Sequence, residues 1–311
     1  MANEVVLSNL TDATVIDYVE QEAVLSGYNK QVFRPVLDAA YRGHVRDFTG
    51  KGDTKLVAQT PSWAMADLTE ATAQANIAFN PTGRSLIPVL VGGKFLVSWE
   101  ANELPELSTV QMIIDEAANS WASFVDSDSS LGYAAQYGEA AASPDHEIGV
   151  DATAYTAALV RQGVVLLMAA KAGGPYNLFL DPIQVGELWQ DSTALSLLKD
   201  QGAQPAGFRA VEGVDIMSKF VGKLFGCNIW MVQSGMIESS GLHSMMVGRH
   251  ALGYAFKKIS TPLSPTPSEL NVDIRWEPAE RAYTVALTIC FQASGTAFTA
   301  TTNKFMVDLI S

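Results

Sequence analysis

The sequence predicts an α+β fold in which, along the chain, a segment of mixed helices and strands is preceded and followed by groups of β-strands. Three observations lead to this expectation. A long amphipathic helical pattern covers residues 108–126, strand-like alternation occupies 84–100 and returns over 269–311, and mixed patterns fill 146–268. A chain of 311 residues can form one large domain or two ordinary ones.

The composition favours association with other protein chains over nucleic-acid binding. Charged residues make up 17% of the chain and hydrophobic residues 48%, and the cores of protein interfaces are depleted in charge. The net charge of −13 opposes binding to a phosphate backbone, which requires Lys and Arg. The densest basic cluster, Phe256–Lys258, is interpreted as a solvated helix end.

The cysteines and the N-terminus give no sign of secretion or of a membrane. Cys227 and Cys290 lie in apolar segments, where two small buried side chains are expected rather than a disulfide. The first ten residues lack the pattern of a signal peptide. The longest strongly apolar run, 163–170, is far shorter than the roughly 20 residues of a membrane span. We therefore expect no membrane partner.

Residues 1–53 are predicted to be an extended arm with one short helix. Val15, Val19, Ala23 and Leu25 lie near one helical face, but the pattern is weak. Gly50–Asp53 then interrupts the chain.

Residues 54–100 are predicted to be a projecting two-stranded hairpin. Strand patterns at 54–66 and 84–100 flank a polar stretch, "DLTEATAQANIAFNPTGRSLIP" at 67–88, that follows neither a helical nor a strand period. Gly92–Lys94 is interpreted as a turn.

Residues 101–145 are predicted to carry the long helix and a linker. Ser108 and Gln111 have capping-box spacing at its start. The apolar stripe recurs every three to four residues and should pack on a sheet. Its predicted core residues are Val110, Ile113, Ile114, Ala117, Trp121 and Phe124.

Residues 146–268 are predicted to form an α/β lobe. A helix capped by Asp151 should end at Gly173–Gly174, with a core face of Ala154, Ala158, Val165, Leu166 and Ala169. A buried strand follows at 176–181, then helices from Pro182 and Ser192. Strands are expected at 208–219 and 228–234, and 243–258 should be a strand that continues into a helix.

Residues 269–311 are predicted to return to strands. Val272, Ile274 and Trp276 share one face of 269–278. A turn at 278–281 leads to a strand at 281–292 with Tyr283, Val285, Leu287, Ile289 and Phe291 in phase. A last strand spans 304–310.

The sequence predicts no catalytic, cofactor or metal site. No phosphate-binding loop, dinucleotide fingerprint or nucleophile elbow occurs. His44, His146, His243 and His250 have no metal-ligand spacing. Asp115 and Glu116 are adjacent and lie on the polar face of the long helix, as solubility charges do.

The order of these elements resembles that of the major capsid proteins of tailed bacteriophages. Each segment is a loose pattern, and their order along nearly the whole chain carries the resemblance. The segments are 66–82 with 87–104 (extension loop), 107–126 (spine helix), 157–190 (axial helix, strand and "DPIQVGELWQ"), and 211–219, 245–258 and 273–295 (closing run).

This resemblance implies a Hong Kong 97-like capsid fold divided into five segments. They are an N-terminal arm (1–53), a two-stranded extension loop (54–100), a peripheral domain with the spine helix (101–145), an axial domain (146–268) and the closing strands of the peripheral domain (269–311). The implied function is self-assembly into pentamers and hexamers of an icosahedral shell that encloses double-stranded DNA without specific binding. Such a protein is made and assembled in the host cytoplasm, ends in the virion, and is not an enzyme.

In that family the extension loop lies over a neighbouring subunit. The polar tip of this chain has no apolar period with which to bury itself, so it is expected to contact another copy. The expected contact residues are Asp67, Leu68, Thr69, Glu70, Asn76, Phe79, Asn80 and Arg84.

Two properties of some family members are not expected. About fifty residues precede the loop, which leaves no room for a cleaved scaffolding segment, so a separate scaffolding protein or none is expected. Lys55 and Lys94 lie near the loop, but no pattern names an Asn acceptor, so covalent cross-links are not expected. A portal protein and a decoration protein are further implied partners.

Two other functions remain open from the sequence. An encapsulin-like compartment would keep the fold but hold an enzyme cargo. A soluble α/β enzyme or ligand-binding protein would need a site where polar groups converge, and none was found.

Overall fold

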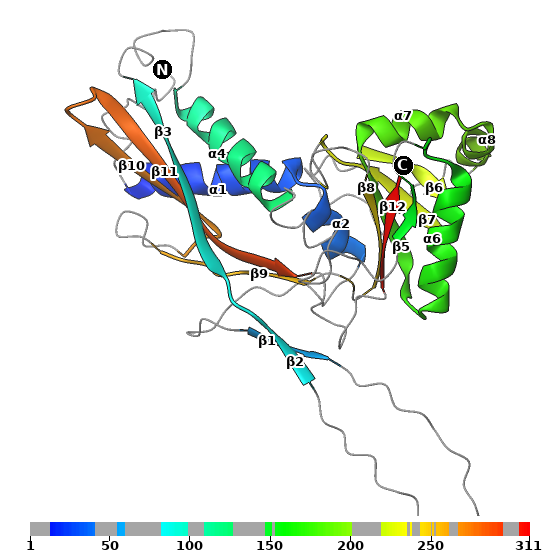
Figure 1. The fold of residues 1–311 in the computed structure, drawn as a ribbon. Helices are drawn as coiled ribbons and strands as arrows, with labels where there is room; N and C mark the ends of the chain where they lie inside the picture. The colour runs from blue at the N-terminus through cyan, green and yellow to red at the C-terminus, as the bar shows by residue number, and fades with distance from the viewer. Residues whose placement is uncertain are drawn as a thin grey trace, which may run out of the picture.

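The computed structural model describes residues 13–40, 55–59, 82–98, 109–126, 147–150, 153–200, 219–234, 237, 243–249, 251, 253–260, 267–294 and 305–311. These residues form two lobes, a short helix between them and a projecting ribbon (Figure 1). Residues 60–81 of the predicted loop, the linker 127–146 and residues 208–218 of the expected strand at 208–219 lie outside them.

The first lobe, called the sheet lobe below, is a four-stranded antiparallel sheet with two helices. Its strands are β3 (Val89–Ser98), β9 (Gly253–Phe256), β10 (Leu270–Glu277) and β11 (Ala282–Ser294), and its helices are α1 (Ala13–Lys30) and α4 (Thr109–Asp126). β11 pairs with β3 on one side and with β10 and then β9 on the other. The inward row of β11, Val285 to Phe291, is buried beneath the helices.

The second lobe, called the α/β lobe below, is a six-stranded mixed sheet in the order β4-β12-β8-β5-β7-β6. Its strands are β4 (Glu147–Gly149), β5 (Gly173–Leu180), β6 (Phe220–Leu224), β7 (Cys227–Met231), β8 (His243–Arg249) and β12 (Met306–Ile310). Helices α6 (Ala157–Ala169), α7 (Pro182–Gln190) and α8 (Ser192–Asp200) accompany it. Neighbouring residues of β5, Leu178 and Phe179, belong to two different hydrophobic clusters, so both faces of this sheet are covered.

The N-terminal segment is part of the core, which corrects the prediction of an extended arm. Helix α1 packs on α4 and β10, and Ile16, Val19 and Ala23 are fully buried, whereas Leu25 is exposed. The buried Glu20 carboxylate accepts a hydrogen bond from the Val272 N–H of β10 at 2.8 Å. A polar residue on the buried face weakened the helical pattern that the sequence shows.

Helix α2 (Phe33–Ala40) lies between the two lobes (Figure 1). The Phe33 ring packs against Phe179 of β5, with ring centroids 4.5 Å apart. The Val32 carbonyl accepts the first backbone hydrogen bond of the helix, from the Val36 N–H, so Val32 is the N-cap residue. Its apolar side chain cannot cap the helix. Asp126, the last residue of α4, supplies the cap from a distance, since its Oδ2 accepts the Val32 N–H at 2.6 Å.

Burial raises the pKa of Asp126 to about 7, although the N–H groups of Val32 and Phe33 and the Lys219 ammonium act in the opposite direction. The folded protein thus holds this proton more tightly than the unfolded chain does. The stabilisation from Asp126 is therefore present at low pH and is lost as the pH rises through about 7.

We expect Asp126→Asn to remove this pH dependence while keeping an oxygen for the Val32 N–H. Relative to the wild type, the variant should gain about 2–3 kcal/mol of unfolding free energy between pH 5 and pH 8. Urea unfolding at both pH values measures the difference. Asp115→Asn, on the exposed face of the same helix, is the control and should show little change. A pH-independent difference for Asp126→Asn would contradict the assignment.

The expected hairpin is shorter than 54–100. Strands β1 (Lys55–Gln59) and β2 (Thr82–Leu86) pair antiparallel in a ribbon of their own, whereas β3 pairs with β11 in the sheet lobe. Gly92–Lys94 is not a turn but the middle of β3. A Cβ at Gly92 would lie 2.7 Å from the Leu287 carbonyl oxygen, so close packing of the two strands explains this glycine.

Helix α6 starts and ends differently from the prediction. It begins at Ala157 and not at Asp151, because the Asp191 carboxylate accepts the Ala157 N–H at 2.8 Å. This hydrogen bond holds the pKa of Asp191 below its ordinary value. The helix ends in a Schellman motif, with Lys171 at a φ of 60°, before Gly173 begins β5.

The buried face of α6 is also not the predicted one. The buried residues are Ala157, Val160, Gly163, Val164 and Leu167, whereas Val165 is 57% exposed. Nearly every position from 163 to 170 is apolar, so hydrophobicity does not distinguish the faces. Gly163 marks the buried face, because a Cβ there would lie 3.1 Å from side-chain atoms of Leu309 and Met246.

Other predictions for the α/β lobe are confirmed. The strand expected at 176–181 corresponds to the second part of β5, which ends at Leu180. Helix α7 starts with Asp181 and Gln184 in a capping box and with Pro182 in the first turn. Helix α8 spans Ser192–Asp200. Cys227 and Cys290 are free and buried, and burial raises the pKa of the Cys227 thiol, which makes it unreactive.

Two strands, β9 and β12, belong to a different lobe from the one that the predicted domain boundaries gave them. Residues 253–258 were expected to be helical within 146–268, but β9 is a strand of the sheet lobe, where Phe256 packs 4.6 Å from Phe291. Lys257 donates its N–H to the Cys290 carbonyl, so Phe256–Lys258 is not a helix end. β12 was expected to close the same sheet as β10 and β11, but it pairs with β8 and β4.

Candidate assembly surface

The ribbon of β1 and β2 projects below both lobes (Figure 1). Its register runs from Lys55 opposite Leu86 to Gln59 opposite Thr82, so the two residues that flank the 60–81 segment are paired. Of the predicted contact residues, Arg84 lies in β2 opposite Val57. The other seven, from Asp67 to Asn80, lie outside the described residues.

The predicted core residues of the long helix face the sheet and α1. Ile113, Ile114, Ala117 and Trp121 are buried, and Val110 and Phe124 are partly buried against the same cluster. Ser108 of the expected capping box lies outside the described residues.

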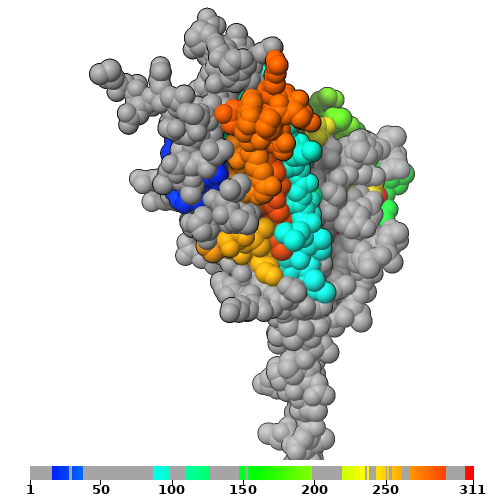
Figure 2. All heavy atoms as spheres, turned by 90° about the vertical axis from the view of Figure 1, so that its left-hand side faces the viewer, coloured from blue at the N-terminus to red at the C-terminus, as the bar shows by residue number. Residues whose placement is uncertain are grey.

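Among the described residues, strand β3 is an edge strand of the sheet lobe. At the opposite edge, the Glu20 carboxylate of α1 takes up a free N–H of β10, but no described strand pairs with the outer side of β3. Its side chains are unusually exposed, with Val89 at 58%, Leu90 at 64% and Leu96 at 52%. Figure 2 shows β3 in cyan along the surface beside β11. An open strand edge with exposed apolar side chains is a surface suited to another protein chain.

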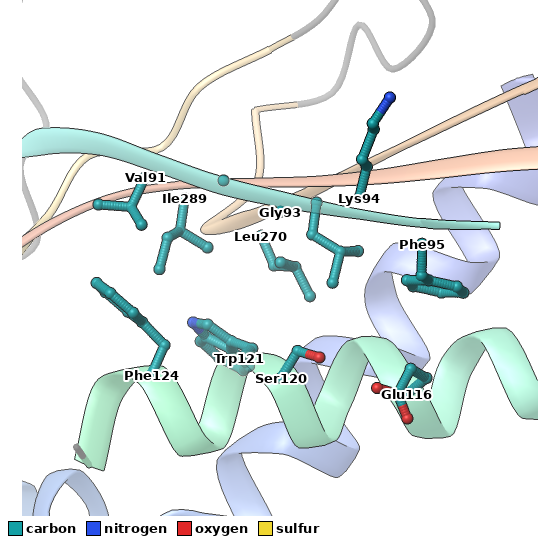
Figure 3. A pocket seen from close by; sticks show the side chains of 12 residues that line it. Val91, Gly93, Lys94, Phe95, Glu116, Ser120, Trp121, Phe124, Leu270 and Ile289 are labelled. Carbon is teal, nitrogen blue, oxygen red and sulfur yellow. The ribbon is translucent and has the colours of Figure 1, made fainter.

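Between β3 and α4 lies a cavity of about 340 Å³, called the β3–α4 cavity below. Val91, Leu270 and Ile289 point into it from the sheet, and Trp121, Ser120 and Phe124 point into it from α4 (Figure 3). Lys94 points away from it. A second hollow of about 870 Å³ adjoins it and shares Phe95 and Glu116. Polar groups do not converge in this cavity as they do in an active site.

The described residues contain no metal-ligating cluster of three or more His, Cys, Asp or Glu side chains. His243 is the one histidine among them, and its Nδ1 lies 2.7 Å from Asp308 Oδ2, which joins β8 to the buried interior of β12. Asp115 is exposed, with Lys30 at 4.0 Å, and Glu116 is exposed on the same helix. None of the described helices combines the length and apolar character that a membrane crossing requires.

Sequence reasoning missed both the open edge of β3 and the cavity beneath it. The apolar runs 87–91 and 95–97 were assigned to a hairpin, so their outward side chains were not considered as a surface. The available signal was the pair Gly92–Gly93 inside a strand, which often marks close backbone approach or a missing side chain.

No protein-family model matches the sequence, and no curated protein matches it. Solved structures are nevertheless similar over most of the chain. The capsid of Ralstonia phage GP4 matches with a TM-score of 0.58 and 12% identity, over 86% of this chain and 85% of that one. A chain of Mycobacterium phage Che8 matches with a TM-score of 0.55 and 13% identity, over 83% and 85%.

Non-phage shells match equally well. A virus-like particle from Pyrococcus furiosus has a TM-score of 0.54 and 9% identity, over 94% of this chain and 98% of that one. These likenesses show that the chain has the fold of phage capsid proteins, a fold that it shares with shell proteins of other origin.

Proposed function

We propose that this chain is the major capsid protein of a tailed bacteriophage. Copies of it assemble through pentamers and hexamers into an icosahedral shell around double-stranded DNA. The observation that carries the proposal is the likeness of fold to phage capsid structures over more than four fifths of the chain. In this assignment α4 is the spine helix of a peripheral domain, the α/β lobe is the axial domain, and β1–β2 is the base of the extension loop.

The surface of the chain supports an assembling role. The β1–β2 ribbon extends away from both lobes, and the apolar edge of β3 has no cover in the described residues (Figures 1 and 2). Both features suit contacts between copies, which in a closed ring or shell join different faces of neighbouring subunits. A portal protein, a separate scaffolding protein and a decoration protein are the further partners of such a shell, which is assembled in the host cytoplasm and becomes part of the virion.

Electron microscopy of the expressed chain, with gel filtration, tests the assembly. We expect closed shells or capsomers of uniform size. A stable monomer under all conditions tried would overturn the proposal.

An encapsulin-like compartment is the second candidate, because an encapsulin of Synechococcus elongatus matches with a TM-score of 0.51 and 10% identity, over 86% of this chain and 84% of that one. The content of particles isolated from their natural source separates the two functions. Duplex DNA inside supports the phage capsid, and a packaged enzyme supports the compartment.

The shell should enclose DNA without binding it tightly. The net charge of −13 per chain gives a repulsive wall overall, so DNA would be held by confinement and counterions. We expect no submicromolar affinity of empty shells or capsomers for duplex DNA at physiological salt, as measured by fluorescence anisotropy. Tight binding with a steep salt dependence would reveal a basic inner face and contradict this expectation.

A further inference from the structure

The two lobes meet at a seam formed by the end of α1, the start of α2, the end of α4 and Lys219, which directly precedes β6. Helix α2 reaches the α/β lobe through the Phe33 ring, which packs on Phe179 of β5. From the other direction, the Lys219 ammonium donates a hydrogen bond to the Lys30 carbonyl at the end of α1. Figure 1 shows α2 between the lobes at this place. Helix α2 and Lys219 therefore tie the two lobes together at the seam.

The seam buries polar atoms that the described residues do not satisfy. The Asp126 side chain is buried, and its Oδ2 accepts the Val32 N–H at 2.6 Å, but its Oδ1 has no hydrogen-bond partner there. Gln31 is fully buried, and its amide nitrogen and amide oxygen both lack a partner among the described residues. Each such atom raises the free energy of the closed seam, because water would satisfy it. Opening the seam to water therefore costs less than its apolar contacts alone would require.

The charged groups near Asp126 come from each element of the seam. Lys219 is the cation that favours the ionised form of its carboxyl group. The Lys30 ammonium of α1 lies 4.0 Å from an exposed carboxylate on the outer side of α4, and the Arg34 guanidinium of α2 is held by Glu269 at 2.7 Å. Burial outweighs Lys219 and the N–H groups of α2, so the pKa of Asp126 rises to about 7. The closed seam therefore holds a neutral carboxyl group at pH 5 and an ionised one at pH 8.

We propose that α2 leaves the seam when Asp126 loses its proton. While the proton is present, the neutral carboxyl group caps the first turn of α2 and keeps the helix between the lobes. Once the proton has passed to the solvent, water solvates the carboxylate better than the seam does, so α2 is released and Asp126 and Gln31 become hydrated. Both sheets stay folded, so the change is local and is not an unfolding of the subunit. The release concerns the single subunit and is independent of assembly into a shell.

Hydrogen exchange of the α2 amides tests the release on the unassembled full chain, under conditions in which the seam closes faster than an exposed amide exchanges. After division by the intrinsic exchange rate, the release equilibrium should rise roughly 80-fold from pH 5 to pH 8 and level off above pH 7, because the pKa of Asp126 falls from about 7 to an ordinary value on release. Amides in the middle of α4 and β11 should exchange at least about tenfold more slowly than those of α2 at both pH values. Equal protection of α2 and these amides would mean that only the whole subunit opens, and would overturn the proposal.

Asp126→Asn tests the group that controls the release. The variant keeps an oxygen for the Val32 N–H but has no proton to lose, so at pH 8 its α2 amides should stay at the low level of release that the wild type shows at pH 5. Asp115→Asn, on the exposed face of α4, should follow the wild type. The same pH dependence in Asp126→Asn as in the wild type would overturn the proposal.

Lys219→Met gives an independent measurement that does not require Asp126→Asn to fold. Without the cation that opposes burial, the Asp126 carboxyl group should keep its proton to a higher pH, so the rise in release should level off at a higher pH than in the wild type. Loss of the hydrogen bond to the Lys30 carbonyl should also increase release at every pH. A structural role of Lys219 alone would increase the release and leave the levelling pH unchanged, and that result would contradict the proposal.

Discussion

A chain in which residues 60–81 are replaced by Asn-Gly folds, remains a soluble subunit and forms no shells. The replacement is geometrically simple, because Gln59 and Thr82 are already paired across β1 and β2 and Asn-Gly is the preferred two-residue hairpin turn. The effect on assembly should be all-or-none if this segment carries the contact to a neighbouring subunit, as we propose. Analytical ultracentrifugation and electron microscopy measure the loss of shells, and circular dichroism reports the subunit fold.

The control for this deletion changes the composition of the segment and keeps its length. Residues 60–81 replaced by a Gly-Ser linker of equal length should also fail to assemble, since the specific contacts are lost. Normal shells from either variant would show that the segment makes no essential contact. Loss of the subunit fold in both would show instead that it packs within its own chain.

Arg34→Ala should lower the unfolding free energy of the subunit by about 3–5 kcal/mol. The guanidinium forms two hydrogen bonds with Glu269, at 2.7 and 3.0 Å, and lies 4.3 Å from the Phe256 ring. The Arg34 side chain is only 9% exposed and that of Glu269 11%, so the substitution leaves a carboxylate in a largely dry site. The pair connects α2, the helix between the lobes, to the sheet lobe.

Urea unfolding of unassembled subunits measures this effect. Arg34→Lys should give an intermediate loss, because an ammonium keeps the charge but cannot form the two parallel hydrogen bonds. Arg275→Ala is the matched control, since its side chain is 64% exposed and 3.9 Å from Asp273, and should change stability by less than about 0.5 kcal/mol. A loss below about 1 kcal/mol for Arg34→Ala would mean that water reaches the pair and replaces it.

The parts of the fold that the sequence predicted are those in which local chemistry and tertiary packing agree. Helix α4 has a regular apolar stripe, and α7 has Pro182 in its first turn, so short-range patterns identified both helices. The alternation in β10 and β11 was equally informative because one face of that sheet is buried beneath helices.

The errors arose where a distant group replaced a local signal. The start of α6 is fixed by Asp191, which is 34 positions from Ala157 in the sequence, and the start of α2 by Asp126, which is 94 positions from Val32. A local sequence pattern does not include such distant residues. Residues 253–256 are a strand because β11 offers a paired edge and Phe256 joins an aromatic cluster, which outweighs a local helical preference. The tip of the loop stays a prediction, since only Arg84 of its named residues is among those described.

The position of β12 has a consequence for the timing of synthesis. This strand lies between β4 and β8, so the sheet of the α/β lobe stays divided until residues 306–310 have left the ribosome. About 160 residues separate β12 from its partner β4, which corresponds to roughly 10–30 s of translation. A nascent chain therefore lacks a finished α/β lobe throughout that interval. In the assembly that we propose, a chain truncated before β12 should therefore be left out of the particle.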